Sequence, residues 1–328
     1  MLTISVVIPT YNCHQYIATA IKSALHSSVV EIIVVDDGST DETTDVVEDV
    51  KQELTADGID SHLLRYIFQT NRGVSAARNR GIDEARGDLI AFLDADDFFF
   101  EQKLSRQIDI FESDETVDIV QCGWKRVNES GGLLETVRPW TEAPKLTIGD
   151  FLKFKPILPS ALLVRRACLV ETKFDTELEA AEDVDLMSRL LLKGYRAEWV
   201  KESLVGYRQH GSNAMGNSLK QARDLNKFLD SFFGKPDLPE HVQMLEQAVR
   251  YYTLVWVACC LQSTGHYVEM SQQLRKAWQY SPHLPIEALV CWIDSFEKFG
   301  LNSPERLDEL FNTQEWQDTV GWLLTQGA

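Results

Sequence analysis

Leu89-Ile90-Ala91-Phe92-Leu93-Asp94-Ala95-Asp96-Asp97 is the stretch that decides the fold, because an apolar, strand-like run ends abruptly in three carboxylates. A buried strand of an open α/β sheet delivers its last residues to the edge where such sheets bind ligands. Like charges this close repel one another, so the cluster is costly unless a cation lies in it. Hard oxygen ligands suit Mg²⁺ or Mn²⁺, especially where a diphosphate completes the shell. The alternative is a solvated acidic turn.

The size and charge of the chain limit the possible classes of protein. Its 328 residues fit two domains of ordinary size, and 44% hydrophobic with 25% charged residues is typical of a globular protein with a large core. A net charge of −18 argues against a nucleic-acid partner. The six cysteines show no C-x-x-C spacing, which favours reduced thiols. Without a signal peptide or a transmembrane segment, we expect a cytoplasmic protein, with peripheral membrane contact left open.

The first half of the chain alternates strands and helices. Strands are predicted at 4–8, 31–35, 62–68 and 89–93, and helices at 14–26, 39–54 and 74–85. Ser39 and Glu42 form a capping-box pattern, which predicts that the second helix begins at Ser39. This alternation indicates a mostly parallel sheet with helices on both faces. The strand at 31–35 also ends in acids, Asp36 and Asp37, so two acidic strand ends should meet at one sheet edge.

The rest of the chain extends this domain and then changes character. A helix at 103–112, a strand at 117–123, a hairpin at 124–140 and a strand at 160–164 are predicted, followed by a helix from Ala180 that closes at Lys193-Gly194. From about residue 219 strand-like runs vanish and helical spacing takes over. We therefore predict a domain at 1–218 and an all-helical domain at 219–328, in whose core most of the five C-terminal tryptophans lie.

Six short blocks resemble a family-2 glycosyltransferase with a GT-A fold, a Rossmann-like mixed and mostly parallel sheet. They occur in the family's order over roughly residues 1 to 215. The blocks are Val7-Ile8-Pro9-Thr10-Tyr11-Asn12, Val34-Val35-Asp36-Asp37-Gly38-Ser39-Thr40-Asp41, Asn71-Arg72-Gly73 through Ala77-Arg78-Asn79, Asp94-Ala95-Asp96-Asp97, Glu182-Asp183 and Tyr207-Arg208-Gln209-His210. The resemblance implies a nucleotide-sugar donor, a divalent metal, Mn²⁺ or Mg²⁺, and inversion at the anomeric carbon.

The resemblance also implies roles for individual residues on the donor side. Tyr11 would lie against the base and Asp37 would accept from a base N–H, although Asp36 can equally be a charge at a helix N-terminus. The other residues expected to bind the nucleotide-sugar are Pro9, Thr10, Asn12, Gly73, Arg78, Asp94, Asp96 and Arg208. The metal would be held by Asp96, Asp97 and His210, and the sequence does not settle which aspartate ligates it directly. Arg78 is either a site cation or a structural partner of the acidic cluster.

Inverting transfer needs one base to take the proton of the acceptor hydroxyl. Asp183 is the candidate, with Glu182 as a supporting or acceptor-orienting acid. The alternative for both is a stabilising charge in the first turn of a helix. Asp185 is left out because Arg189, four residues on, explains it as a plain ion pair.

The resemblance, together with the acidic clusters, implies an inverting, metal-assisted transferase. It would move a hexose, in the first instance from a UDP-sugar, to a glycan, lipid-linked or protein acceptor. The alternative is a catalytically inactive nucleotide-sugar-binding protein whose helical domain recruits partners. Nucleotidyl transfer is a third reading, but it would need a glycine-rich basic loop where Pro9-Thr10-Tyr11-Asn12 stands. The donor sugar, the acceptor and the oligomeric state are not encoded in any motif that we identify.

Overall fold

A computed structural model describes residues 2–211, 217–299 and 304–326 of the chain. The chain divides into two compact units, Met1–Gly211 and Ser212–Ala328. The sequence placed the boundary after residue 218, which is the first residue of helix α8.

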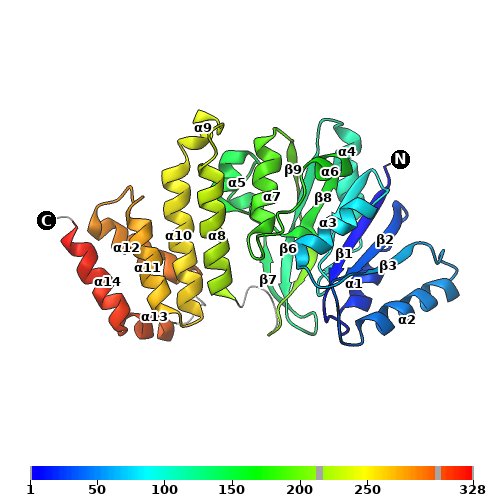
Figure 1. Ribbon diagram of the computed structural model, residues 1–328, viewed down its shortest axis with the longest axis horizontal. Coiled ribbons are helices and arrows are strands. Elements are labelled where there is room, and N and C mark those ends of the chain that lie inside the picture. Colours follow the sequence, from blue (N-terminus) through cyan, green and yellow to red (C-terminus); the bar gives the residue numbers. More distant parts are fainter. Residues whose placement is uncertain (1, 212–216, 300–303, 327–328) are drawn as a thin grey trace. The chain divides into compact units, whose positions relative to one another are not determined.

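The first unit alternates strands and helices in its first half, as the sequence predicted (Figure 1). Its strands are β1 (Ile4–Thr10), β2 (Val29–Asp36), β3 (Leu64–Phe68), β4 (Leu89–Phe92), β5 (Phe98–Phe99), β6 (Ile119–Val127), β7 (Leu133–Val137), β8 (Leu162–Arg165) and β9 (Ala197–Arg208). Its helices are α1 (Ile17–Ser23), α2 (Thr43–Ala56), α3 (Val74–Glu84), α4 (Lys103–Ser113), α5 (Ile148–Phe154), α6 (Arg166–Glu171) and α7 (Glu182–Leu192), with short 3₁₀ turns at Pro139–Thr141 and Pro159–Ala161.

These strands form one mixed sheet in the order β3-β2-β1-β4-β8-β6-β9-β5, with β7 paired to β6. The strands from β3 to β4 are mutually parallel, and so are β6 and β9. Strand β8 is antiparallel to both of its neighbours, and β7 forms the predicted antiparallel hairpin with β6. The prediction of a mixed, mostly parallel sheet is therefore confirmed.

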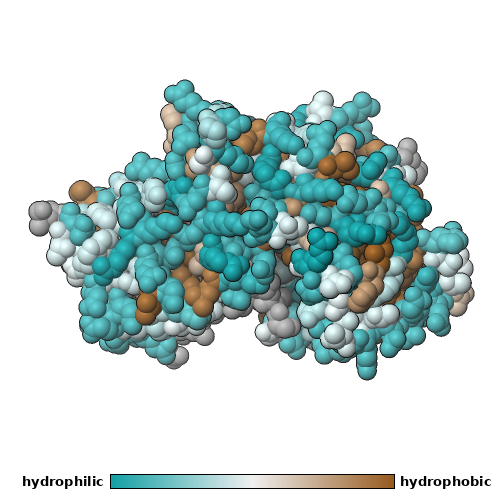
Figure 2. Space-filling view, viewed as in Figure 1, coloured by the Kyte–Doolittle hydropathy of each residue, from teal (hydrophilic) through white to brown (hydrophobic). Residues whose placement is uncertain are grey.

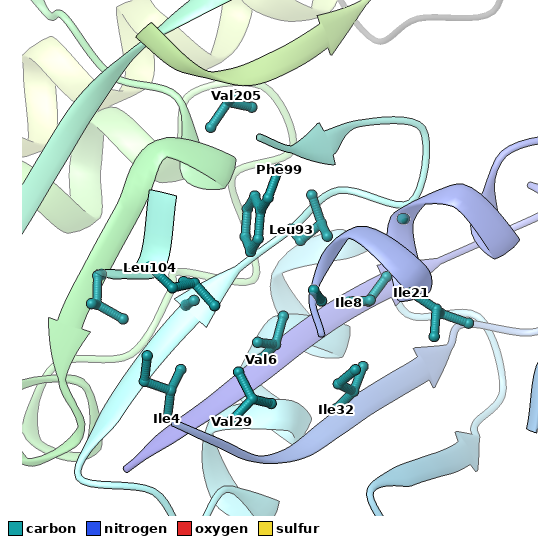
Figure 3. Close-up of a cluster of buried hydrophobic side chains, with 14 of the residues drawn as sticks. Ile4, Val6, Ile8, Ile21, Val29, Ile32, Leu93, Phe99, Leu104 and Val205 are labelled. Carbon is teal, nitrogen blue, oxygen red and sulfur yellow. The ribbon is translucent and has the colours of Figure 1, made fainter. Parts of the chain in front are cut away.

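Helices cover both faces of the sheet, so the central strands are buried on both sides. Every residue of β1 is buried, which is typical of a parallel strand between two helical layers. Ile4, Val6 and Ile8 face a core shared with helices α1, α2 and α4 (Figure 3). On the opposite face, helix α3 lies so close to β1 that a Cβ on Gly81 would come within 2.2 Å of Val7 Cγ1.

The parallel arrangement brings the two acidic strand ends to one edge. Strand β1 lies between β2, which ends at Asp36, and β4, which leads into Asp94. The capping-box prediction at Ser39 is wrong, because helix α2 begins at Thr43. Asp41 accepts the Thr43 N–H at 3.0 Å instead, while the Ser39 hydroxyl accepts from Asn12. The residues between strand and helix thus form a longer loop beside the site.

The second unit is helical throughout its described part. Its helices are α8 (Ser218–Phe233), α9 (Glu240–Gln243), α10 (Glu246–Ser263), α11 (Tyr267–Trp278), α12 (Pro285–Phe299), α13 (Pro304–Phe311) and α14 (Gln314–Thr325). Trp292 and Trp316 are buried in its core, whereas Trp256, Trp278 and Trp322 are half-buried, so fewer of the five tryptophans are fully buried than predicted. All six cysteines lie in described segments and are unpaired. Within the described residues, no helix has the length and apolarity needed to cross a membrane. The face shown in Figure 2 is mostly hydrophilic, with hydrophobic residues in small patches.

Candidate active site

Arg78 joins the acidic edge of the sheet to the start of helix α7. Its guanidinium donates to Asp94 Oδ1 at 2.7 Å and to Glu182 Oε1 at 2.8 Å. The side chain is buried, and the guanidinium lies 5.2 Å from the centroid of the Phe174 ring. Of the two interpretations of Arg78, the structural partner of the acidic residues is the one that these contacts favour. The bridge brings Asp94, Glu182 and the neighbouring Asp183 into one region.

Asp183 stands in the first turn of α7 and is half-buried. Burial, together with the nearby charge of Glu182, raises the pKa of Asp183 to about 7. The positive charge of Arg78 opposes this rise without cancelling it. Asp183 also accepts the Val184 N–H at 2.7 Å, so the helix-start interpretation describes part of its environment. A carboxylate with a pKa near neutrality is suited to taking up a proton at physiological pH.

Asp96 and His210 come together from segments far apart in the sequence. His210 Nε2 lies 3.0 Å from Asp96 Oδ2, and both side chains are largely buried. Burial, and then repulsion from Asp94, raises the pKa of Asp96. These two residues supply one oxygen and one nitrogen donor, a pair that suits Mn²⁺.

Asp97 has different partners from the other two residues predicted to bind metal. It is 1% exposed, and its oxygens accept from the Ser160 hydroxyl at 2.7 Å and the Arg208 N–H at 3.1 Å. Burial and the charge of Asp96 raise its pKa well above the ordinary range. Among the described residues no group of three or more histidine, cysteine or acidic side chains is arranged to hold a metal. The predicted set of Asp96, Asp97 and His210 is thus assembled only in part.

Arg208 is engaged by the protein itself. Its Nε donates to the Asp96 carbonyl at 3.0 Å, and its Nη1 donates to the Glu129 carbonyl in the β6–β7 hairpin. Arg208 is 6% exposed. Arg208 therefore connects the loop that carries Asp96 to the β6–β7 hairpin, a role that the sequence did not suggest. Its predicted part in binding the nucleotide-sugar is not tested by these contacts.

Two residues near this site were missed in the sequence. Tyr16, just before α1, packs its ring against His210 and under the guanidinium of Arg208. Ser160 donates to Asp97 and accepts the Asp94 N–H at 3.1 Å. Neither has a local signal, because each meets its partners only through the tertiary fold.

The loop after β1 presents the residues predicted to meet the base. Tyr11 is 52% exposed, so part of its side chain is accessible to a ligand. Asn12 adopts a left-handed conformation with φ of 49°, which asparagine tolerates better than most residues. Its Oδ1 accepts the Thr40 N–H at 2.8 Å, and its own N–H donates to Ser39 Oγ at 2.9 Å. This reciprocal pair fixes the loop after β1 against the loop after β2.

Asp37 organises the neighbouring loop. Its carboxylate accepts the N–H groups of Arg72 at 2.9 Å and Gly73 at 2.7 Å, and the amide of Gln69 at 2.7 Å. The other acid of the pair, Asp36, accepts from Ser39 N–H and from a tyrosine hydroxyl, and it does not act at a helix N-terminus. Pro9 and Thr10 end β1 beside these loops. The residues predicted from the sequence to bind the nucleoside thus lie together at one edge of the sheet.

Comparison with known proteins places this geometry in a family context. Residues 5–162 match the family described as Glycosyl transferase family 2. A putative teichuronic acid biosynthesis glycosyltransferase of Bacillus subtilis, TuaG, is 29% identical over 223 residues, which cover 67% of this chain and 84% of TuaG. An uncharacterized glycosyltransferase of Nostoc is 37% identical over 155 residues, or 44% of this chain, and one of Rickettsia bellii is 28% identical over 209 residues, or 62%. The chain matches only 43% and 29% of the lengths of these last two relatives.

Solved structures show the same fold. S. aureus TarS 1-349 in complex with UDP-GlcNAc superposes with a TM-score of 0.62 and 21% identity, over 99% of this chain and 92% of TarS. The mannosyltransferase PcManGT of Pyrobaculum calidifontis, in complex with GDP-Man and Mn²⁺, gives 0.61 and 16%, over 99% and 87%. The GT-A fold predicted from the sequence is confirmed.

Proposed function

Because residues 5–162 belong to glycosyl transferase family 2, we propose that the chain is an inverting glycosyltransferase that moves a hexose from a nucleotide-sugar to an acceptor hydroxyl. The observation that carries this proposal is the Arg78 bridge. It holds the acids that follow β4 beside helix α7, where Asp183 has a pKa near 7. Inverting transfer requires this arrangement, in which the acidic residues at the sugar-donor side lie next to a group that can accept a proton.

The donor proposed is a UDP-sugar, held at the edge of the sheet. The exposed Tyr11 ring stacks on the base, and Asn12 and Asp37 keep the two surrounding loops in place through their hydrogen bonds. TarS, which shares the fold, binds UDP-GlcNAc, whereas PcManGT binds GDP-Man. The nucleotide is therefore the first property to test.

A divalent cation, Mn²⁺ or Mg²⁺, fits the residues at Asp96 and His210. Their donor atoms lie 3.0 Å apart, and cations that bind nucleotides often use only one or two protein ligands with phosphate oxygens filling the shell. When bound, the cation would neutralise charge on the departing diphosphate. Asp97 accepts a hydrogen bond from Ser160, which holds the loop that carries Asp96, and Asp97 stays a predicted metal ligand.

Asp183 is the proposed general base. As the bond between the anomeric carbon and the phosphate oxygen breaks, the acceptor oxygen bonds to that carbon from the opposite face and its proton passes to the Asp183 carboxylate. Glu182 keeps its hydrogen bond from Arg78, which also donates to Asp94, so the start of α7 is held beside Asp94. The acceptor proposed is a glycan, lipid-linked or protein hydroxyl, consistent with the description of TuaG. The free thiols support a cytoplasmic setting.

Replacing Asp183 by asparagine tests the mechanism. We expect nucleotide binding to persist and transfer to fall by about 10²- to 10⁴-fold, the usual contribution of a general base. The assay is release of the nucleoside diphosphate from UDP-, GDP- and dTDP-hexoses, with binding followed by calorimetry. Asp185→Asn is the matched control, because Asp185 lies in the same turn but is paired to Arg189 at 2.6 Å. Wild-type turnover by Asp183→Asn would show that the base is another residue.

A further inference from the structure

The Tyr16 ring lies against His210 and Arg208, two residues beside the loop that carries Asp96. Its ring centroid is 5.1 Å from that of His210, with the planes 31° apart, and the Arg208 Cζ lies 4.8 Å from the same ring. The Tyr16 backbone is held by a turn, since its N–H donates to the Cys13 carbonyl at 3.1 Å and its carbonyl accepts the Thr19 N–H at 2.9 Å. The ring is therefore presented by a rigid element.

Both ring partners of Tyr16 contact Asp96. His210 Nε2 is 3.0 Å from the Asp96 carboxylate, and Arg208 Nε donates to the Asp96 carbonyl at 3.0 Å. We propose that Tyr16 is a positioning residue that holds His210 and Arg208 against Asp96 and so presets the metal and diphosphate end of the donor site. This inference rests on the proposed function. It also links that end to the loop that carries Tyr11, because both tyrosines follow β1.

The ring, and not the hydroxyl, makes these contacts. No hydrogen bond to the Tyr16 hydroxyl is found among the described residues. An aromatic face attracts a guanidinium and stacks favourably with an imidazole, which aliphatic side chains do not do. Without that face, His210 and Arg208 each lose one of the contacts that hold their rotamers, and a ligand has to restore those positions at a cost in affinity, although Arg208 keeps its hydrogen bonds to the Asp96 and Glu129 carbonyls.

Two substitutions separate the ring from the hydroxyl. Tyr16→Phe keeps the ring and should match wild type, whereas Tyr16→Leu removes the aromatic face. For Tyr16→Leu we expect affinity for UDP with saturating Mn²⁺ to fall by about 2- to 30-fold, the range for such contacts. Affinity for UDP in EDTA should fall less, because Tyr11 and Asp37 are untouched and the metal no longer contributes. Calorimetric titration of the full chain measures both, with GDP or dTDP substituted if wild type prefers one of them.

Three results would overturn the inference while leaving the proposed function intact. These are wild-type affinity in Tyr16→Leu, an equal loss with and without Mn²⁺, and a Tyr16→Phe as weak as Tyr16→Leu. If Tyr16→Leu does not fold, Tyr16→Met takes its place, since methionine adapts to irregular packing. In a His210→Gln background the Tyr16→Leu effect should shrink, and full additivity would contradict action through His210. Wild-type protein that binds no nucleotide would overturn the proposed function, and this inference with it.

Discussion

Replacing Arg78 by methionine removes the charge that links the two acidic parts of the site. Arg78 is 3% exposed, and its guanidinium donates to both Asp94 and Glu182. Methionine fills much of the same space but leaves these two carboxylates without a compensating charge. Breaking a buried ion pair from one side typically costs about 3–5 kcal/mol. For a unit of this size, 1 kcal/mol shifts the Tm by about 2–4 °C, so we expect the Tm to fall by about 6–20 °C.

The same substitution should change the pH dependence of turnover. Burial and the charge of Glu182 raise the pKa of Asp183 to about 7, and Arg78 limits the rise. Without Arg78 the pKa rises further. Because the base must be deprotonated, the rate increases as the pH passes through the pKa of Asp183, and the acid limb of the profile should move to higher pH in Arg78→Met.

Differential scanning calorimetry and the pH profile of nucleoside diphosphate release measure the two effects. Arg80→Met is the matched control, because Arg80 lies on the same helix, is itself exposed, and pairs with Glu84 in a surface ion pair that should be worth at most about 1 kcal/mol. Arg78→Lys, which keeps the charge, should fall between wild type and Arg78→Met. A Tm within 2 °C of wild type together with an unmoved acid limb, the 2 °C being roughly the effect of 1 kcal/mol, would refute the reasoning.

Three other substitutions test the packing and electrostatics of the first unit. Gly81→Ala should cost about 1–3 kcal/mol in urea unfolding because its Cβ meets Val7, and adding Val7→Ala should recover part of the loss. Asp97→Asn should destabilise by about 1–3 kcal/mol, since its amide group cannot accept from both the Ser160 hydroxyl and the Arg208 N–H; an unchanged urea midpoint would argue against these bonds. Burial lowers the pKa of Lys103 to about 8. Because the unfolded chain then holds this proton more tightly than the folded chain, wild type should gain stability from pH 8 to pH 10 by roughly 1.4 kcal/mol per unit of pKa shift. Lys103→Met should lack that gain.

The sheet and its acidic edge were predictable because their signals are local. Strand β1 is buried on both faces, so its apolar run is continuous in the sequence. The acids that end β2 and follow β4 lie at the same edge of the sheet, because the parallel strands end there. Strand β5 had no such signal. It has two residues and pairs with β9 where Gly206 leaves room, since a Cβ there would come within 2.2 Å of the Phe98 ring.

The individual roles in the site depended on contacts between distant residues. Arg78 could be placed on its helix from the sequence, but its partners lie 16 and 104 residues away, so the choice between site cation and structural partner needed the fold. Tyr16 reads as part of an amphipathic helix start, and nothing local indicates that its ring meets the end of β9. The capping-box pattern misled for a related reason, because the Ser39 hydroxyl is taken by Asn12 from another loop.

Calorimetric titration of UDP, GDP and dTDP into the full chain, each with and without Mn²⁺, tests the central claim most directly. The account predicts that one nucleotide binds tightly and that its affinity depends on the metal, because Asp96 and His210 supply only two of the ligands that the cation needs. Binding of that nucleotide should then weaken in Asp96→Ala. No binding of any nucleotide under either condition would contradict a donor site at the edge of this sheet.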